Sequence, residues 1–333
     1  MNDTNHNILQ VKGLRKYFPI RKGFFQRITG WVKAVDNVDF DIEDGQTLGL
    51  VGESGCGKST VARMILKLLE PDQGEIIFRG KDISRISEKE MKPFRKEIQI
   101  VFQDPYGSLN PRMTVGQSIE EGLRKLGIPG GEERSVRLEK LLKMVGMSPD
   151  SADRYPHEFS GGQRQRIGIA RALSVEPSLI ICDEPISALD VSIQAQIINL
   201  LKDLQDQLGL SYLFISHDLN VVGYLCNMVA VMYKGNIMEL APAEDLYSRP
   251  GHPYTHTLLS AIPEPEPGKS IEALAVREDI SADMPPPIGC AFQGRCPRQE
   301  PGCRDESMPF QKIGEDHFVR CWRVAKDGTA LYE

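Results

Sequence analysis

The chain has 333 residues, of which 41% are hydrophobic and 26% charged, proportions typical of a globular protein in water. This length is enough for two domains, one large and one smaller. The formal net charge of -6 argues against a general nucleic-acid binder, because no basic excess is present to offset a phosphate backbone; a local basic face is left open.

No apolar run approaches the roughly 18 to 20 residues that a membrane-spanning helix needs. The first seven residues are polar and lack the apolar core of a signal peptide. We therefore expect a cytoplasmic chain whose membrane role, if it has one, comes through a partner.

The first predicted elements are strands and an insertion. Residues 8–18 predict a strand that ends in two aromatic residues, and residues 33–42 alternate apolar and polar side chains as a half-buried strand does. Residues 20–32 are basic and aromatic and contain two glycines, so they predict a loop or hairpin insertion outside the core. Contact with solvent, with nucleotide or with lipid headgroups would each suit this insertion.

A glycine-rich loop follows, between a predicted buried strand at 47–51 and a predicted helix at 61–69. The loop matches G-x-x-x-x-G-K-[S/T], the phosphate-cradling motif, and consists of Gly52, Glu53, Ser54, Gly55, Cys56, Gly57, Lys58, Ser59 and Thr60. Its glycines permit backbone angles and close approach that a Cβ would obstruct, so that N–H groups point at anionic oxygens. Lys58 supplies a mobile charge for the outer phosphates, and Ser59 a hydroxyl ligand to Mg²⁺.

Strands and helices alternate after the loop. Strands are predicted at 74–80, 97–103, 179–185 and 211–216, a hairpin at 228–240, and helices at 115–126, 132–145 and 191–208. The stretch from 104 to 171 is predominantly helical. This order predicts an α/β fold with a largely parallel sheet, a helical insert, and ligands gathered at the strand ends.

Two carboxylates, Asp183 and Glu184, end the predicted strand 179–185 after an apolar run. A carboxylate at such a position can hold Mg²⁺ through water beside Ser59, and Glu184 can orient and deprotonate an attacking water. A solvated strand end is the plainer alternative for the pair taken alone.

A second anion site is predicted at the start of the helix after Phe159. Ser160 suits the N-cap position, and Gly161 and Gly162 expose backbone donors at the positive end of the helix. With Gln163 these residues form the string Ser-Gly-Gly-Gln.

With this string, the chain resembles the ATP-binding subunit of an ABC transporter from about residue 8 to residue 261. The resemblance implies a P-loop ATPase with a mostly parallel core sheet, an antiparallel β subdomain and a helical subdomain. It implies that Ser160 to Gln163 complete the ATP site of the opposing subunit. It also implies that Gln103 senses Mg²⁺ and links the subunit to its membrane partner, and that the loop 187–190, including Asp190, contacts the facing subunit. His217 would contact the γ-phosphate. Tyr17 would stack on the adenine, with Phe18 as a rival for that role.

Further segments are similar to the dipeptide and oligopeptide importer subfamily, namely residues 32–36, 104–112, 251–255, 286–290 and 295–297. This resemblance implies ATP hydrolysis that powers peptide import through two permease subunits at the cytoplasmic face of the membrane. A peptide-binding protein outside the membrane and a second, related ATPase as heterodimer partner are expected, and no nucleic acid. The alternatives are a homodimer, another substrate such as nickel, a soluble ABC ATPase that acts on DNA or ribosomes, and a regulatory nucleotide-dependent switch.

Four of the seven cysteines lie near the carboxyl end, after linker signals at 263–268 and 285–287: Cys290, Cys296, Cys303 and Cys321. In a reducing compartment they suggest metal before disulfides. No Cys-x-x-Cys pair is present, so the zinc signal is weak, and four thiolates also suit an iron–sulfur cluster. The resemblance implies a [4Fe–4S] cluster, with Zn²⁺ or unligated thiols as alternatives. We expect an ATPase domain at 1–262, with its helical subdomain at about 104–171, and a cysteine-rich extension at 263–333.

Overall fold

The structure is a computed structural model that describes all residues except 1–5, 24–25, 263–288, 305–307, 309 and 328–333. The chain divides into two compact units. The helical unit comprises residues 1–8, 43–47 and 86–216, and the phosphate-loop unit comprises residues 9–42, 48–85 and 217–333. The predicted linker signals at 263–268 and 285–287 lie outside the described residues.

The helical unit contains three parallel strands, β6 (Ile98–Val101), β7 (Leu179–Asp183) and β8 (Ser211–Ser216). β7 lies between the other two, with Ile98 opposite Leu179 and Leu179 opposite Ser211. Most of their residues are buried, which explains why each segment is mainly apolar in the sequence. The three predicted strands are confirmed.

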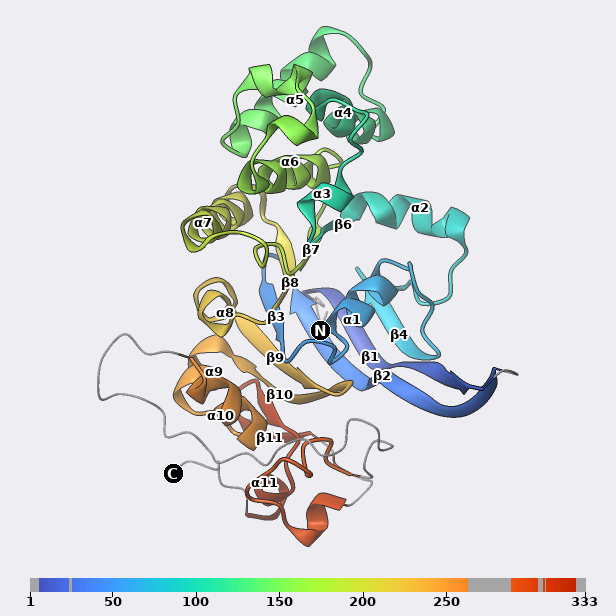
Figure 1. The fold of residues 1–333 in the computed structure, drawn as a ribbon, viewed down its shortest axis with the longest axis vertical. Coiled ribbons are helices and arrows are strands. Elements are labelled where there is room, and N and C mark those ends of the chain that lie inside the picture. The colour runs from blue at the N-terminus through green and yellow to red at the C-terminus, as the bar shows by residue number, and fades with distance from the viewer. Residues whose placement is uncertain (1–5, 24–25, 263–288, 305–307, 309, 328–333) are drawn as a thin grey trace, which may run out of the picture. The chain divides into compact units, whose positions relative to one another are not determined.

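The rest of the helical unit is built from helices: α2 (Glu88–Glu97), α3 (Pro105–Ser108), α4 (Val115–Lys125), α5 (Glu132–Met144), α6 (Gly161–Leu173) and α7 (Val191–Leu208), with 3₁₀ turns at Pro149–Asp153 and Pro156–Glu158. Figure 1 shows α4, α5 and α6 grouped at one end of this unit. α4 begins in a capping box in which Thr114 and Gln117 satisfy each other's backbone N–H groups. The predicted helical insert and the helices at 115–126, 132–145 and 191–208 are confirmed.

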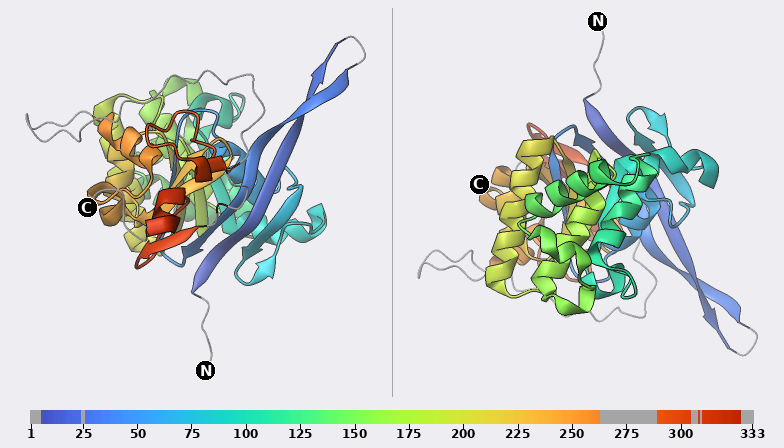
Figure 2. Two further views of the ribbon diagram at one scale, coloured as in Figure 1. Left: turned by 90° about the horizontal axis from the view of Figure 1, so that it is seen from below. Right: turned by 90° about the horizontal axis from the view of Figure 1, so that it is seen from above.

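The phosphate-loop unit contains an antiparallel sheet in the order β2-β1-β4-β5. Its strands are β1 (Asn7–Lys22), β2 (Arg27–Glu43), β4 (Gln73–Phe78) and β5 (Lys81–Asp82). Figure 2 shows β1 and β2 running together as one long two-stranded ribbon. The described residues of the predicted insertion at 20–32 therefore mostly continue these two strands, and they are exposed apart from the half-buried Gly30, with Trp31 at 52%.

A second set of strands in this unit follows the order β11-β12-β10-β9-β3. They are β3 (Thr47–Val51), β9 (Met228–Tyr233), β10 (Asn236–Pro242), β11 (Gln311–Gly314) and β12 (His317–Val319). β3 and β9 are parallel, and β9 and β10 form the predicted hairpin. The helices are α1 (Lys58–Ile65), α8 (Leu219–Leu225), α9 (Ala243–Ser248), α10 (Pro253–Ser260) and α11 (Trp322–Asp327), with a 3₁₀ turn at Pro301–Arg304. Among the described residues no helix is long and apolar enough to cross a bilayer.

A buried carboxylate attaches the carboxyl-terminal strands to this unit. β12 pairs antiparallel with β10, with Val319 opposite Glu239. The side chain of Glu239 is fully buried and accepts from the backbone N–H groups of Gly251 at 2.7 Å and His252 at 2.9 Å. His317 Nε2 lies 2.7 Å from the same carboxylate and donates to it, because a carboxylate oxygen only accepts. Three donors therefore share one buried carboxylate.

Replacing Glu239 with glutamine is expected to lower the free energy of unfolding by about 1 to 3 kcal/mol. The amide places an NH₂ group against an N–H donor, and a buried donor loses its acceptor. Chemical denaturation of the full chain measures the change. Glu315→Gln, an exposed carboxylate in the β11–β12 turn, is the matched control and should stay within about 0.5 kcal/mol of wild type. Equal effects of the two substitutions would contradict the role of Glu239.

Candidate functional site

The glycine-rich loop lies between β3 and α1, as predicted, and two of its glycines have no room for a side chain. A Cβ at Gly52 would lie 2.1 Å from the carbonyl oxygen of Met232, and one at Gly57 2.1 Å from that of Ala34. Both residues have positive φ angles, 149° and 117°. The sequence-based reason for these glycines is confirmed, because only glycine fits this backbone so close to its neighbours.

Lys58 is 5% exposed and lies at the first position of α1. Its Nζ donates to the carbonyl oxygens of Gly52 at 2.7 Å and Glu53 at 3.1 Å. The ammonium group therefore lies against the loop backbone at the N-terminus of α1, and helix N-termini in general favour anions. Cys56 is buried beside it, and this burial raises the pKa of the thiol, so Cys56 acts as a neutral packing residue.

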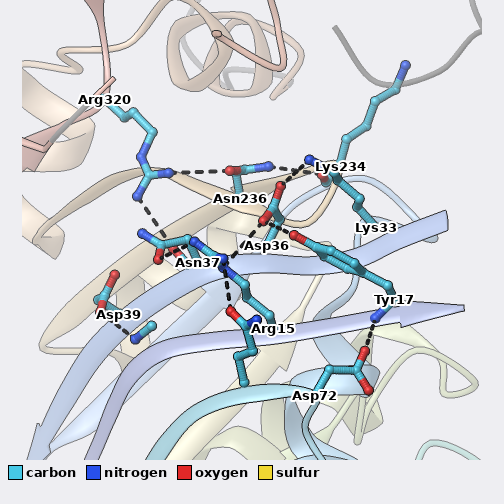
Figure 3. A network of polar contacts seen from close by, with 12 residues as sticks. Arg15, Tyr17, Lys33, Asp36, Asn37, Asp39, Asp72, Lys234, Asn236 and Arg320 are labelled. Carbon is cyan, nitrogen blue, oxygen red and sulfur yellow. Dashed lines mark hydrogen bonds and ion pairs between the residues drawn. The ribbon is translucent and has the colours of Figure 1, made fainter. Parts of the chain in front are cut away.

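Tyr17 lies on β1 in a polar network of the phosphate-loop unit (Figure 3). Its hydroxyl donates to Asp36 at 2.6 Å, and its backbone N–H donates to Asp72 at 2.7 Å. Burial and then the hydrogen bond to Asp36 raise the pKa of Tyr17 to about 12. Phe18 is 38% exposed with the ammonium of Lys16 over its ring. The tyrosine is thus held in place and the phenylalanine is accessible, so adenine stacking by Tyr17 stays a prediction with Phe18 as its rival.

In the helical unit, the two predicted carboxylates lie at the carboxyl end of β7. Glu184 has a φ of 49°, a left-handed conformation that non-glycine residues seldom adopt, and its backbone N–H donates to Ile215 of β8 at 3.0 Å. Gln103, just beyond β6, donates its Nε2 to Glu184 Oε2 at 3.0 Å. The structure therefore brings together two predicted site residues that lie 81 positions apart. A constrained backbone at such a position is typical of functional sites.

His217 directly follows β8 in the chain and is exposed. Its place at a strand tip agrees with the prediction, and its contact with a γ-phosphate stays a prediction. Asp183 is the last residue of β7 and is half-buried, so a carboxylate lies at this strand end as expected.

The Ser-Gly-Gly-Gln string forms the start of α6. Ser160 is the N-cap, and it forms a capping box with Gln163, as its position in the sequence predicts. Asp190 likewise caps α7 by accepting from Ile193 N at 3.0 Å. Hydrogen bonds from Ser192 and Ile193 lower the pKa of Asp190, so the carboxylate is ionised and accessible.

Gly162 has a packing role that the sequence did not reveal. A Cβ at this position would lie 2.4 Å from Ile193 Cγ2 of α7, whereas Gly168 in the same helix has no atom within 4 Å of its Cβ position. The two glycines therefore form a matched pair for substitution, one in close contact and one in open space.

Gly162→Ala is expected to lower the free energy of unfolding by about 1 to 3 kcal/mol, because Ile193 must shift. Gly168→Ala is expected to leave stability unchanged or raise it by up to about 1 kcal/mol, because alanine favours the helix. Thermal unfolding of both variants gives the comparison. A Gly162→Ala protein as stable as wild type would refute the close packing.

Two residues of the helical unit that the sequence analysis missed connect α6 to the segment after Gln103. The guanidinium carbon of Arg164 lies 3.5 Å from the centre of the Tyr106 ring, and its Nε donates to Pro156 O at 2.6 Å. Arg171 donates to Ser108 O. The spacing of these arginines, seven residues apart on one helix, is the only sequence signal for a shared face.

The four carboxyl-terminal cysteines are all buried, with exposed fractions of 6–7%. Burial raises the pKa of Cys290 to about 12, and electrostatic interaction with Cys321, Cys303 and Cys296 adds to this shift. The backbone N–H of Cys290 donates to Cys303 O at 2.9 Å. Within the described ranges, however, no three or more His, Cys, Asp or Glu residues are grouped as ligands of a metal ion. The cluster and zinc predictions therefore have no direct support from a formed site.

Family models match two separate stretches of the chain. A family model described as "ABC transporter" matches residues 35–187, and one described as "Oligopeptide/dipeptide transporter, C-terminal region" matches residues 238–303. The oligopeptide transport ATP-binding protein AppF of Bacillus subtilis is 51% identical over 321 residues, which cover 96% of this chain and 98% of AppF. A putative peptide import ATP-binding protein of Brucella ovis is 51% identical, with 96% and 99% covered.

Solved structures agree with these matches. CbiO1 from Clostridium perfringens, described as part of the ABC transporter complex CbiONQ, has a TM-score of 0.63 at 28% identity and covers 73% of this chain and 92% of its own. The ATP-binding cassette MJ0796, in a dimeric post-hydrolysis state bound to ADP and Pi, has a TM-score of 0.61 at 29% identity, with 71% and 98% covered. The resemblance and the ABC-type α/β fold are confirmed. The chain therefore belongs to the ABC transporter ATPases, in the group of oligopeptide and dipeptide transport ATP-binding proteins.

Proposed function

We propose that this chain binds and hydrolyses ATP to power the import of dipeptides or oligopeptides through two separate permease subunits. The observation that carries the proposal is the 51% identity, over 96% of the chain, to relatives named for oligopeptide transport and peptide import. The match to the oligopeptide/dipeptide transporter C-terminal region supports the same substrate class. The place of action would be the cytoplasmic face of the membrane.

In the proposed mechanism the loop 52–60 cradles the phosphates, and Lys58 moves from its own loop carbonyls to the outer phosphates. Glu184 accepts the proton of the attacking water, and Gln103 holds its carboxylate in place at 3.0 Å. Mg²⁺, when bound, neutralises developing charge on the phosphates. The residues proposed to hold it are Ser59, Gln103 and, through water, Asp183. His217 would contact the γ-phosphate, and Tyr17 the adenine.

A second ATPase subunit would complete the site. The start of α6, Ser160 to Gln163, in which Ser160 and Gln163 are exposed, and the exposed Asp190 are proposed to contact the ATP held by the facing subunit. ATP then joins the two subunits and hydrolysis releases them, which shifts the population of transporter states. We propose a heterodimer with a related ATPase.

The four carboxyl-terminal cysteines suit a metal group because of their chemistry. Four buried thiols near the carboxyl end have the number and the chemistry of the donors that a [4Fe–4S] cluster takes. We propose that Cys290, Cys296, Cys303 and Cys321 hold a [4Fe–4S] cluster in the extension 263–333, beside an ATPase domain at 1–262. Anaerobic purification should give a brown protein with iron and sulfide. Colourless protein with stoichiometric zinc would overturn the assignment.

Co-expression with its permeases, its partner ATPase and the peptide-binding protein tests the proposed function. Vesicles that contain the complex should accumulate labelled peptide only when ATP is supplied. Accumulation of nickel instead of peptide would move the chain to another substrate. Co-purification with DNA or ribosomes, without the membrane subunits, would favour a soluble ABC ATPase.

A further inference from the structure

The segment that carries Cys290 and Cys296 makes direct contact with the phosphate loop. Arg295 Nη1 lies 3.0 Å from both carboxylate oxygens of Glu53, the second residue of the loop. The Arg295 side chain is 19% exposed and that of Glu53 44%. The guanidinium carbon of Arg295 also lies 5.7 Å from the centres of the Phe292 and Tyr233 rings, so two aromatic side chains flank the group in addition to Glu53.

A second set of contacts joins the cysteine segment to the phosphate loop. Phe292, which lies between Cys290 and Cys296 in the sequence, is fully buried and packs against Tyr254, with ring centres 5.2 Å apart. The hydroxyl of Tyr254 accepts a hydrogen bond from the backbone N–H of Glu53 at 3.1 Å. Glu53 is therefore held through its side chain by Arg295 and through its backbone by Tyr254.

Glu53 also accepts a hydrogen bond from Lys58. Lys58 Nζ donates to its carbonyl oxygen at 3.1 Å, so one loop residue contacts the phosphate-binding lysine, Tyr254 and the arginine of the cysteine segment. The carboxylate of Glu53 brings negative charge into a loop that must accept phosphates, and Arg295 balances this charge. Loss of the arginine would leave that charge unpaired.

We propose that Arg295 is a positioning residue for the phosphate loop, through which the order of the cysteine segment sets the affinity for nucleotide. The inference rests on nucleotide binding by the loop and does not depend on which substrate the transporter carries. Because coupling between two sites is reciprocal, bound nucleotide also stabilises the cysteine segment. The extension thus acts on the ATP site from 242 positions away in the sequence.

Calorimetric titration of the full chain with Mg·ADP tests the proposal. Arg295→Ala is expected to raise the dissociation constant by about three- to fivefold, the range of a partly exposed ion pair. Arg295→Lys keeps the positive charge but loses the planar guanidinium group, so its dissociation constant should lie between those of wild type and Arg295→Ala. Arg323→Ala is the matched control: it lies in the same extension and pairs with Glu300 at 3.4 Å, and it should stay within about twofold of wild type. Equal affinities for Arg295→Ala and wild type would overturn the proposal.

Two further measurements separate positioning from a loss of folding. In a double-mutant cycle, Glu53→Gln should offset most of the effect of Arg295→Ala, because it removes the unpaired charge, whereas simple additivity of the two effects would overturn the proposal. In hydrogen exchange followed by mass spectrometry, Mg·ADP should slow the exchange of residues 289–304 in wild type and less so in Arg295→Ala. Equal protection in both proteins would show that the coupling does not pass through Arg295.

Discussion

Replacing Glu184 with glutamine is expected to lower ATP hydrolysis by about 10²- to 10⁴-fold and to leave ATP binding intact. An amide cannot accept the proton of the attacking water, so the general base is lost. The shape of the site should survive, because the glutamine oxygen can still accept from Gln103 Nε2, which lies 3.0 Å from the carboxylate in wild type. The strained backbone at φ 49° is also unaffected by a change at the end of the side chain.

Phosphate release by the complex with its cognate partner subunit measures turnover, and titration with a nucleotide measures binding. Glu176→Gln is the matched control, since Glu176 is an acidic residue of the same unit whose carboxylate pairs on the surface with Arg137. It should hydrolyse ATP at the wild-type rate. A Glu184→Gln complex with near-normal turnover would refute the role of Glu184 as general base, and loss of binding would show that the carboxylate acts on nucleotide affinity instead.

The fold was predictable where the sequence pattern is local. The strands 179–185 and 211–216 are apolar runs, the helix 191–208 has apolar residues at helical spacing, and all three agree with the structure. α2 was missed because its sequence is almost entirely polar, with one buried residue, Met91, and a proline inside the helix. Its only strong signal was the capping box of Ser87 and Glu90, which precedes no apolar stripe.

Sequence motifs predicted the individual residues of the site but not the contacts between distant residues. The loop glycines and the N-cap Ser160 follow from motifs whose spacing is fixed by backbone geometry. The contacts of Glu53 with Arg295 and of Glu239 with His317 join residues 242 and 78 positions apart. No local pattern encodes such pairs, because they depend on which segments the fold places side by side. The same holds for the close packing of Gly162 on Ile193, which a helix-start motif alone does not reveal.

Lys58→Ala is expected to weaken nucleotide binding by about 10- to 100-fold, the range for loss of a charged hydrogen-bond donor. In the structure Nζ donates to Gly52 and Glu53, and contact with a phosphate would replace these bonds. The measured loss is therefore the difference between two sets of hydrogen bonds.

Lys67→Ala provides the control for Lys58→Ala. Lys67 is also buried, at 9% exposure, and its Nζ also donates to a backbone carbonyl, that of Ser84 at 3.2 Å. Its loss should lower the free energy of unfolding without changing nucleotide affinity, since it lies beyond α1 and not in the loop. If both variants lost affinity equally, the loss would come from general destabilisation of the unit. If only Lys58→Ala did so, the charge itself is what binds the phosphates, because the two substitutions remove the same group from equally buried surroundings.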